Sequence, residues 1–207
     1  MSHSLPKTAA FIAGAFLSLV SHAEQRSKCH KGDAPDYYFA QNTFSDDASS
    51  DEFTRGWYSK HLRAMEEPSL SCGDQPATYR FIWLRTFHHP VSIRAIKNGE
   101  AEFSVIATEM DGEGGYDPGE VKRRIQVKLS PGKARALQDM IKVASLPKLP
   151  TASKEFGFDG AEWIFEIREG KEYHVVERWS PKKGVVHDLG LFFLNLPNWD
   201  FPQEEVY

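Results

Sequence analysis

The sequence is poor in cysteine, with only Cys29 and Cys72 among its 207 residues. So few thiols exclude a small scaffold held together by several disulfides. They also exclude a zinc site made of four thiolates, and their wide separation does not match the Cys-x-x-Cys spacing of a redox pair. The two cysteines therefore matter to the fold chiefly if they pair with each other.

The sequence also lacks an excess of positive charge, since 25 Lys and Arg residues stand against 29 Asp and Glu residues, for a net charge of −4. Proteins dedicated to nucleic acids normally present a basic field, so DNA and RNA are not expected as partners. After residue 23, no apolar run approaches the roughly 20 residues needed to span a bilayer. The mature chain is therefore expected to be soluble and not membrane-spanning.

Residues 1–23 have the three parts of a secretory signal peptide. Lys7 supplies a positive charge, and the apolar stretch 8–20 follows it. Ser21 and Ala23 then provide the small residues that a signal peptidase requires. As a helix, the apolar stretch would be only about 20 Å long, which is short of a bilayer core of about 30 Å. The sequence therefore predicts an exported protein that is periplasmic or extracellular.

Export changes the interpretation of the two cysteines. In an oxidising compartment, two cysteines more often pair than stay free, so Cys29 and Cys72 are predicted to form a disulfide. On the chain-entropy model, closing a loop of this length stabilises the fold by up to about 4 kcal/mol. The bridge would tie an irregular N-terminal arm, residues 24–48, to the body of the protein.

The spacing of apolar residues predicts an α+β domain. Strands are expected at 79–86, 91–97, 101–110, 120–129, 161–169 and 172–180, and helices at 49–67, 130–146 and 186–196. Short connections between neighbouring strands favour a mostly antiparallel sheet of about six strands with two or three helices packed on it. We therefore predict a single domain over 49–196, followed by an exposed tail at 197–207.

Capping signals place the starts of the first two helices. Ser49 and Glu52 have the spacing of a capping box, which predicts a helix beginning near residue 49. Ser130 followed by Pro131 matches an N-cap residue with proline at the first helical position.

The stretch "MDGEGGYDPGE" at residues 110–120 contains four glycines and several carboxylates. A calcium loop of the EF-hand type requires a glycine at position six and a glutamate at position twelve, and neither requirement is met when counting starts at Asp111. The glycines instead favour a hairpin loop between two strands. A looser site for calcium or another divalent cation, made by Asp111, Glu113 and Asp117, is the alternative.

The second hairpin, residues 161–180, suggests a catalytic pair. A three-residue turn at 169–171 would place Glu166 directly opposite His174. A carboxylate beside an imidazole can act as an acid/base pair, although such a cross-strand pair is more often a simple ion pair on a solvated face. Glu166 and His174 are therefore the candidate catalytic residues of this sequence.

Two further polar groups have simpler interpretations. His88 and His89 are adjacent, so in an extended chain their side chains point to opposite faces, and they would share one metal ion only if the chain bends at Pro90. The row Lys122, Arg124 and Lys128 could hold an anionic ligand, but charged side chains on an edge strand also serve to prevent aggregation.

The sequence therefore favours a binding role over catalysis. It shows no Gly-x-Ser-x-Gly nucleophile motif and no nucleotide-binding loop. We expect an exported module that needs no cofactor and binds another envelope protein, a glycan or a second copy of itself. The alternative is a hydrolase that uses Glu166 and His174, or a metal held by Asp111, Glu113 and His88.

Overall fold

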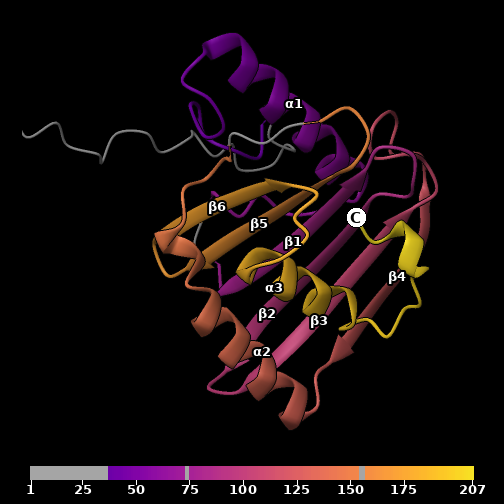
Figure 1. The fold of residues 1–207 in the computed structure, drawn as a ribbon. Coiled ribbons are helices and arrows are strands. Elements are labelled where there is room, and N and C mark those ends of the chain that lie inside the picture. The colour runs from indigo at the N-terminus through magenta and orange to yellow at the C-terminus, as the bar shows by residue number, and fades with distance from the viewer. Residues whose placement is uncertain (1–36, 73–74, 154–156) are drawn as a thin grey trace, which may run out of the picture.

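The computed structural model describes residues 37–72, 75–153 and 157–207. These residues form one antiparallel sheet of six strands with three α-helices (Figure 1). The predicted α+β class is therefore confirmed. The predicted signal peptide and Cys29 lie outside the described residues, so the leader and the Cys29–Cys72 bridge stay predictions. None of the described helices has the length and hydropathy needed to cross a membrane.

The strands follow the order β4-β3-β2-β1-β5-β6 across the sheet. Their bounds are β1 Thr78–Arg85, β2 Val91–Gly99, β3 Glu102–Met110, β4 Val121–Lys128, β5 Ala161–Glu169 and β6 Glu172–Trp179. The helices are α1 Ala48–Ala64, α2 Pro131–Ala144 and α3 Val185–Leu194. The connection through α2 brings β5 back to the centre of the sheet, beside β1.

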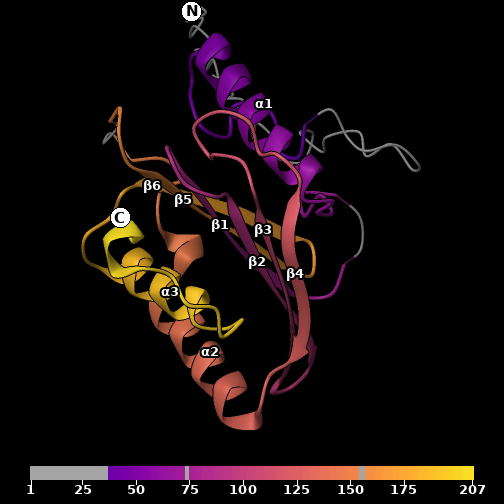
Figure 2. The same cartoon turned by 90° about the vertical axis from the view of Figure 1, so that its right-hand side faces the viewer.

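The side of the sheet covered by α2 and α3, here called the core face, is apolar (Figure 2). It carries the fully buried rings of Phe81, Trp83, Trp163 and Phe165. Gly190 allows α3 to approach this layer, because a Cβ at that position would overlap the Trp163 ring. The aromatic rings of the central strands therefore form the main hydrophobic core with the two helices.

The opposite side, here called the α1 face, is covered by α1 and is mixed in character (Figure 2). Ile82 and Ile164 pack there against Tyr58 and Leu62 of the helix. Between these apolar contacts lie buried charged residues, among them Arg80, which is fully buried. All eight residues of β1 are consequently buried, as expected of a central strand covered on both sides.

The two predicted helix starts have different outcomes. Ser130 caps α2 by accepting a hydrogen bond from the Lys133 backbone N–H at 3.4 Å, and Pro131 opens the helix, which confirms the prediction. The capping box at Ser49 and Glu52 is wrong. Asp47 caps α1 instead, because its carboxylate accepts the Ser50 backbone N–H at 2.8 Å.

The segment 197–207 is not an exposed tail. Trp199, Phe201 and Tyr207 pack against the main core, and the Trp163 indole N–H donates to the Tyr207 backbone oxygen at 2.8 Å. The prediction was wrong because it followed the prolines and charges of the segment and gave too little weight to the aromatic rings that alternate with them.

The described part of the predicted N-terminal arm, residues 37–47, is irregular but packed. Tyr38 and Phe39 are buried beside α1, and the Tyr38 backbone N–H donates to Ser59 Oγ at 2.9 Å. This part of the arm therefore belongs to the folded domain.

Candidate functional site

The second hairpin adopts a register one residue away from the predicted one. Glu169 pairs with Glu172 around a two-residue turn, which places Glu166 opposite Val175 and Ile167 opposite His174. Neighbouring residues of a strand point to opposite faces, so Glu166 and His174 lie on different sides of the sheet. The structure does not bring this candidate pair together.

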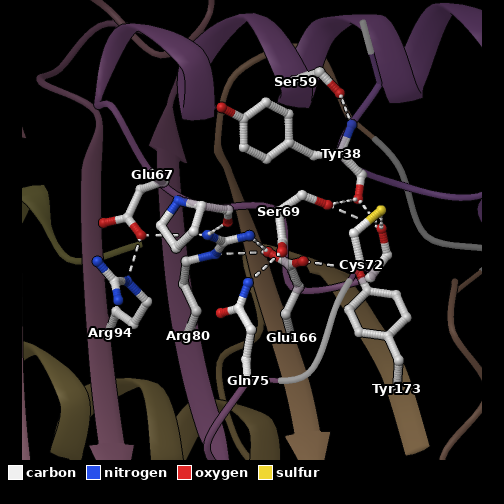
Figure 3. Close-up of polar contacts among 12 residues, drawn as sticks. Tyr38, Ser59, Glu67, Ser69, Cys72, Gln75, Arg80, Arg94, Glu166 and Tyr173 are labelled. Atoms are coloured by element: carbon white, nitrogen blue, oxygen red, sulfur yellow. Dashed lines mark hydrogen bonds and ion pairs between the residues drawn. The ribbon is translucent and has the colours of Figure 1, made fainter. Parts of the chain in front are cut away.

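Each member of that pair has other partners. The Tyr173 hydroxyl donates to Glu166 Oε1 at 2.7 Å, and Arg80 Nε donates to Glu166 Oε2 at 2.7 Å (Figure 3). The His174 Nε2 atom lies 3.0 Å from the Leu149 backbone oxygen. Glu166 is fully buried. These contacts are structural, and they leave Glu166 closed to a substrate.

Glu166 belongs to a buried charge cluster that also contains Arg80, Glu67 and Arg94 (Figure 3). Glu67 Oε2 accepts from Arg80 at 3.2 Å and from Arg94 Nε at 2.7 Å. The Pro68 backbone oxygen accepts a further bond from Arg80 at 2.7 Å. Two cations face two anions, so the cluster neutralises itself and ties β1, β2 and β5 to the segment that follows α1.

The candidate cation ligands Asp111, Glu113 and Asp117 form a turn. Asp111 Oδ1 accepts the Glu120 N–H at 2.7 Å, and Asp117 Oδ1 accepts the Gly119 N–H at 3.0 Å. Within the described ranges, no three His, Cys, Asp or Glu side chains are placed to hold a metal ion. The structure does not bring the three carboxylates into one site.

This loop is instead docked on the end of β1. A Cβ on Gly114 would lie 2.6 Å from the Arg85 backbone, and one on Gly115 would lie 2.6 Å from the Thr86 oxygen. The Gly115 N–H donates to that oxygen at 3.1 Å, and Lys60 of α1 donates to the Tyr116 oxygen at 3.1 Å. The glycines therefore permit close backbone contact, which fixes Tyr116 at the surface.

The remaining polar groups of the sequence also have partners. His88 Nδ1 lies 2.7 Å from the Tyr207 hydroxyl, whereas His89 Nδ1 lies 2.9 Å from the Gly112 oxygen. The basic row is neutralised, with Arg124 at 2.6 Å from Glu66, Lys122 at 3.2 Å from Glu109 and Lys128 at 3.3 Å from Glu102. Neither group therefore forms an open site.

A pocket of about 410 Å³ opens where the docked loop, α1 and one end of the sheet meet. Its size is within the range of pockets that hold small ligands. Aromatic side chains dominate its lining, namely Phe53, Trp57, Tyr58, Tyr116, Phe158 and Trp179. They come from α1, the β3–β4 loop, the segment before β5 and the end of β6.

Exposed aromatic rings of the described residues gather at this pocket. The exposed fractions are 71% for Phe53, 56% for Tyr116 and 92% for Phe158, and all three line the pocket. Phe87 is 50% exposed, and its ring centroid lies 6.2 Å from that of Tyr116. Large exposed apolar groups that cluster mark an interaction site more often than scattered ones do.

The polar floor of the pocket is the side chain of Glu162 on β5. Burial raises the pKa of Glu162 to about 9, and the charge of Glu177 on β6, with a hydrogen bond to it, adds to that shift. Burial also raises the pKa of Glu177, although Glu162 and the charge of Arg178 oppose this change. Burial raises the pKa of the neighbouring Tyr58 well above its ordinary value, so Tyr58 stays a neutral phenol.

This arrangement leaves one carboxyl oxygen without a donor. Glu162 Oε2 is buried and has no hydrogen-bond partner among the described residues. A buried acceptor in this state is costly, and native structures usually satisfy it with water or a ligand. The pocket therefore combines aromatic walls with the Glu162 carboxyl, whose pKa of about 9 keeps it protonated near neutral pH.

A second cavity, of about 390 Å³, lies between α2 and the opposite end of the sheet. Its polar groups include Tyr79, whose hydroxyl donates to Glu169. That pair satisfies itself, and no cluster of exposed aromatic rings surrounds this cavity in the part of the chain that the structure describes. The first pocket is the better candidate site.

Sequence reasoning missed this site because it is assembled from five segments that lie far apart in the sequence. The predicted three-residue turn at 169–171 would place Glu162 opposite Arg178, whereas the actual register places it opposite Trp179 and on the same face as Glu177. The available signal was the presence of aromatic residues in segments expected to be loops, such as Tyr116 and Phe158.

Comparisons with known protein families, with curated proteins and with solved structures find no match for this chain. The function therefore has to be argued from the pocket itself.

Proposed function

We propose that this protein is an exported binding module and that the aromatic pocket is its ligand site. The observation that carries the proposal is the gathering of Phe53, Tyr116 and Phe158, all strongly exposed, around one cavity with a carboxyl floor. Exposed rings cost free energy in water, and covering them with a ligand recovers it. The ligand would come from an envelope component, such as a glycan or a segment of another envelope protein.

The test is a panel of aromatic, sugar and amine fragments screened by ligand-observed NMR against the full chain. Fragments that bind the wild type are expected to lose at least fivefold in affinity with Tyr116→Ala, because its exposed ring can be removed without opening the core. Val143→Ala is the matched control, since Val143 is 72% exposed on α2 and lies outside the pocket. Fragments that bind both variants as well as the wild type would contradict the proposal.

Export is tested separately from binding. A chain expressed with residues 1–23 is expected to be recovered outside the cytosol with its N-terminus after Ala23. Non-reducing peptide mapping of that product is expected to show a Cys29–Cys72 cross-link. Recovery of an uncleaved chain in the cytosol with two reactive thiols would contradict both expectations.

A hydrolase remains the second candidate, now with different residues. Two carboxyls that share a proton can act as acid and base toward a bound water, and Glu162 and Glu177 have this arrangement. Glycoside hydrolysis by two carboxyls instead requires them to stand at least about 5 Å apart on either side of the bond, which a hydrogen-bonded pair does not satisfy. Turnover of peptide or glycan substrates that disappears with both Glu162→Gln and Glu177→Gln would favour this candidate over simple binding.

A further inference from the structure

The chemistry of the pocket also points to a class of ligand, an inference that rests on the proposed function. The pocket has a marked asymmetry of charge. Among the described residues that line it, none is Lys, Arg or His, while Glu162 contributes a carboxyl and Glu177 stands behind it. An anionic ligand would find no cationic partner on these walls.

The walls favour a cation for a second reason. The face of an aromatic ring is electron-rich and attracts a positive charge placed over it. Trp57 already shows this behaviour, because the Lys60 ammonium lies 5.5 Å from the centre of its ring. Lys60 itself is neutralised by Asp117 at 3.1 Å, so it is held at the rim and does not enter the pocket as a counter-charge.

One oxygen at the floor of the pocket has no hydrogen-bond partner among the described residues. This atom is the buried Glu162 Oε2, so a ligand that brings N–H groups would satisfy it. Quaternary ammonium groups have no N–H and would leave that oxygen unsatisfied. Hydroxyl groups could donate to it, but they would not balance the charge left when the carboxyl pair ionises.

We propose that the pocket binds a small organic cation, of the ammonium or amidinium class, whose N–H groups donate to Glu162 while its apolar part lies against the rings of Tyr116 and Phe158. The ligand charge takes the place of the proton that Glu162 otherwise holds. Binding therefore releases one proton to the solvent, and charge is conserved.

This exchange makes the affinity depend on pH. The groups facing Glu162 are Tyr58 from α1 and Glu177 from β6, with Arg178 acting on the latter, while β1 offers the apolar Leu84. The ion pair at the rim, formed by Lys60 of α1 and Asp117 of the β3–β4 loop, also lies near. The Glu162 carboxyl is protonated near neutral pH, so binding of the cation carries the cost of removing a proton from it. This cost falls as the pH rises, and the affinity for the cation therefore increases.

The experiment uses the wild-type chain and two probes of the same shape, benzamidine as the cation and benzamide as the neutral control. Titration calorimetry is expected to show benzamidine binding at least tenfold more tightly than benzamide at pH 8. The affinity for benzamidine is expected to rise by up to tenfold per pH unit between pH 6 and pH 8, while that for benzamide stays constant. Glu162→Gln is expected to remove this pH dependence, and Glu177→Gln to reduce it.

The outcomes separate the two proposals. The protein could bind benzamide as tightly as benzamidine, or prefer a chitooligosaccharide. If Tyr116→Ala abolishes that binding, the proposal of a cationic ligand is overturned and the pocket remains the ligand site. Binding of benzamidine that is indifferent to Tyr116→Ala would overturn both. The comparison of the two probes on the wild type needs no variant, so it stands even if Glu162→Gln fails to fold.

Discussion

On the core face of the sheet, α2 and α3 cover rings such as Phe81 and Trp163, whereas the α1 face also carries buried ion pairs such as Arg80–Glu166. Both layers are buried, but they depend on different interactions. Aromatic packing is limited by shape, since a buried ring tolerates neither a void nor an overlap. Buried charge is limited by pairing, since each ion was removed from water and needs its partner. The two faces should therefore fail for different reasons.

The largest expected effect is the loss of a partner on the α1 face. Arg80→Met leaves Glu166 and Glu67 buried without their shared cation, so the free energy of unfolding should fall by about 3–5 kcal/mol. Chemical denaturation of the wild type and the variant measures this difference.

A second change distinguishes lost pairing from lost packing. Adding Glu166→Leu to Arg80→Met removes the stranded charge, so the double variant should be more stable than the single one. If the double variant is instead destabilised by the sum of the effects of Arg80→Met alone and Glu166→Leu alone, the stability of the α1 face depends on packing, as that of the core face does.

The next effect concerns shape on the core face. Gly190→Ala places a methyl group against the Trp163 ring, so α3 has to shift, at a cost of about 1–3 kcal/mol. Gly132→Ala in α2 is the matched control, because a Cβ there meets nothing within 4 Å. That control should be neutral or stabilising by up to about 1 kcal/mol. Thermal unfolding of the two variants in parallel tests the difference, and equal melting temperatures would refute it.

The difference between the faces also explains what the sequence could predict. Phe81 with Trp83, and Ile82 with Leu84, alternate clearly enough to indicate a central strand covered on both sides, and the six strands and three helices were found. The same double coverage made the second hairpin ambiguous. With apolar residues such as Phe165 and Ile164 required on both faces, burial does not select one register over the next.

The buried charges and the pocket escaped prediction for another physical reason. Arg80 stands between Tyr79 and Phe81 and is indistinguishable in sequence from a residue that reaches solvent. Its partner Glu67 lies beyond the end of α1, and Glu166 lies on β5, so only the assembled fold brings the three together. Likewise, Glu162 acquires its raised pKa from burial in the assembled fold and from the neighbouring Glu177, while its hydrogen bond with Tyr58 opposes the rise.

A smaller effect should appear as a dependence of stability on pH. The pKa of Glu162 is about 9 in the folded protein against 4.5 for an ordinary Glu. The stability that its protonated form contributes is therefore fully present below about pH 4.5 and is lost as the pH rises toward 9. The slope for one proton is at most about 1.4 kcal/mol per pH unit. Denaturation of the wild type at pH 7 and pH 8 should show a decline of about 1 kcal/mol from this group, and Glu162→Gln should remove it.

His61 acts in the opposite direction, which sets the window of that measurement. Burial lowers the pKa of His61 below its ordinary 6.5, so the stability it contributes is present above that pH and is lost as the pH falls. Working between pH 7 and pH 8 therefore keeps the titration of His61 outside the measured interval. The free energy of unfolding of the wild type could instead be the same at pH 7 and pH 8, as is expected for Glu162→Gln. This result would show that Glu162 is ionised in the folded protein.

The smallest effect is expected at the Lys128–Glu102 pair on the edge of the sheet. Its atoms lie 3.3 Å apart, a distance similar to the 3.2 Å between Arg80 and Glu67, but its side chains are 66% and 57% exposed. Exposed pairs contribute little because water and salt screen them, so Glu102→Gln should change the free energy of unfolding by less than about 0.5 kcal/mol.

Glu67→Gln is the buried counterpart of that change, since the Glu67 side chain is 1% exposed and pairs with both Arg80 and Arg94. Losing its charge strands two cations and should cost several times more than Glu102→Gln. Denaturation at low and high salt compares the two variants, and only the Glu102 effect should shrink with salt. If Glu67→Gln and Glu102→Gln lower the free energy of unfolding equally, contact distance and not burial sets the strength of ion pairs in this sheet. The contrast between its two faces would then have to be attributed to packing alone.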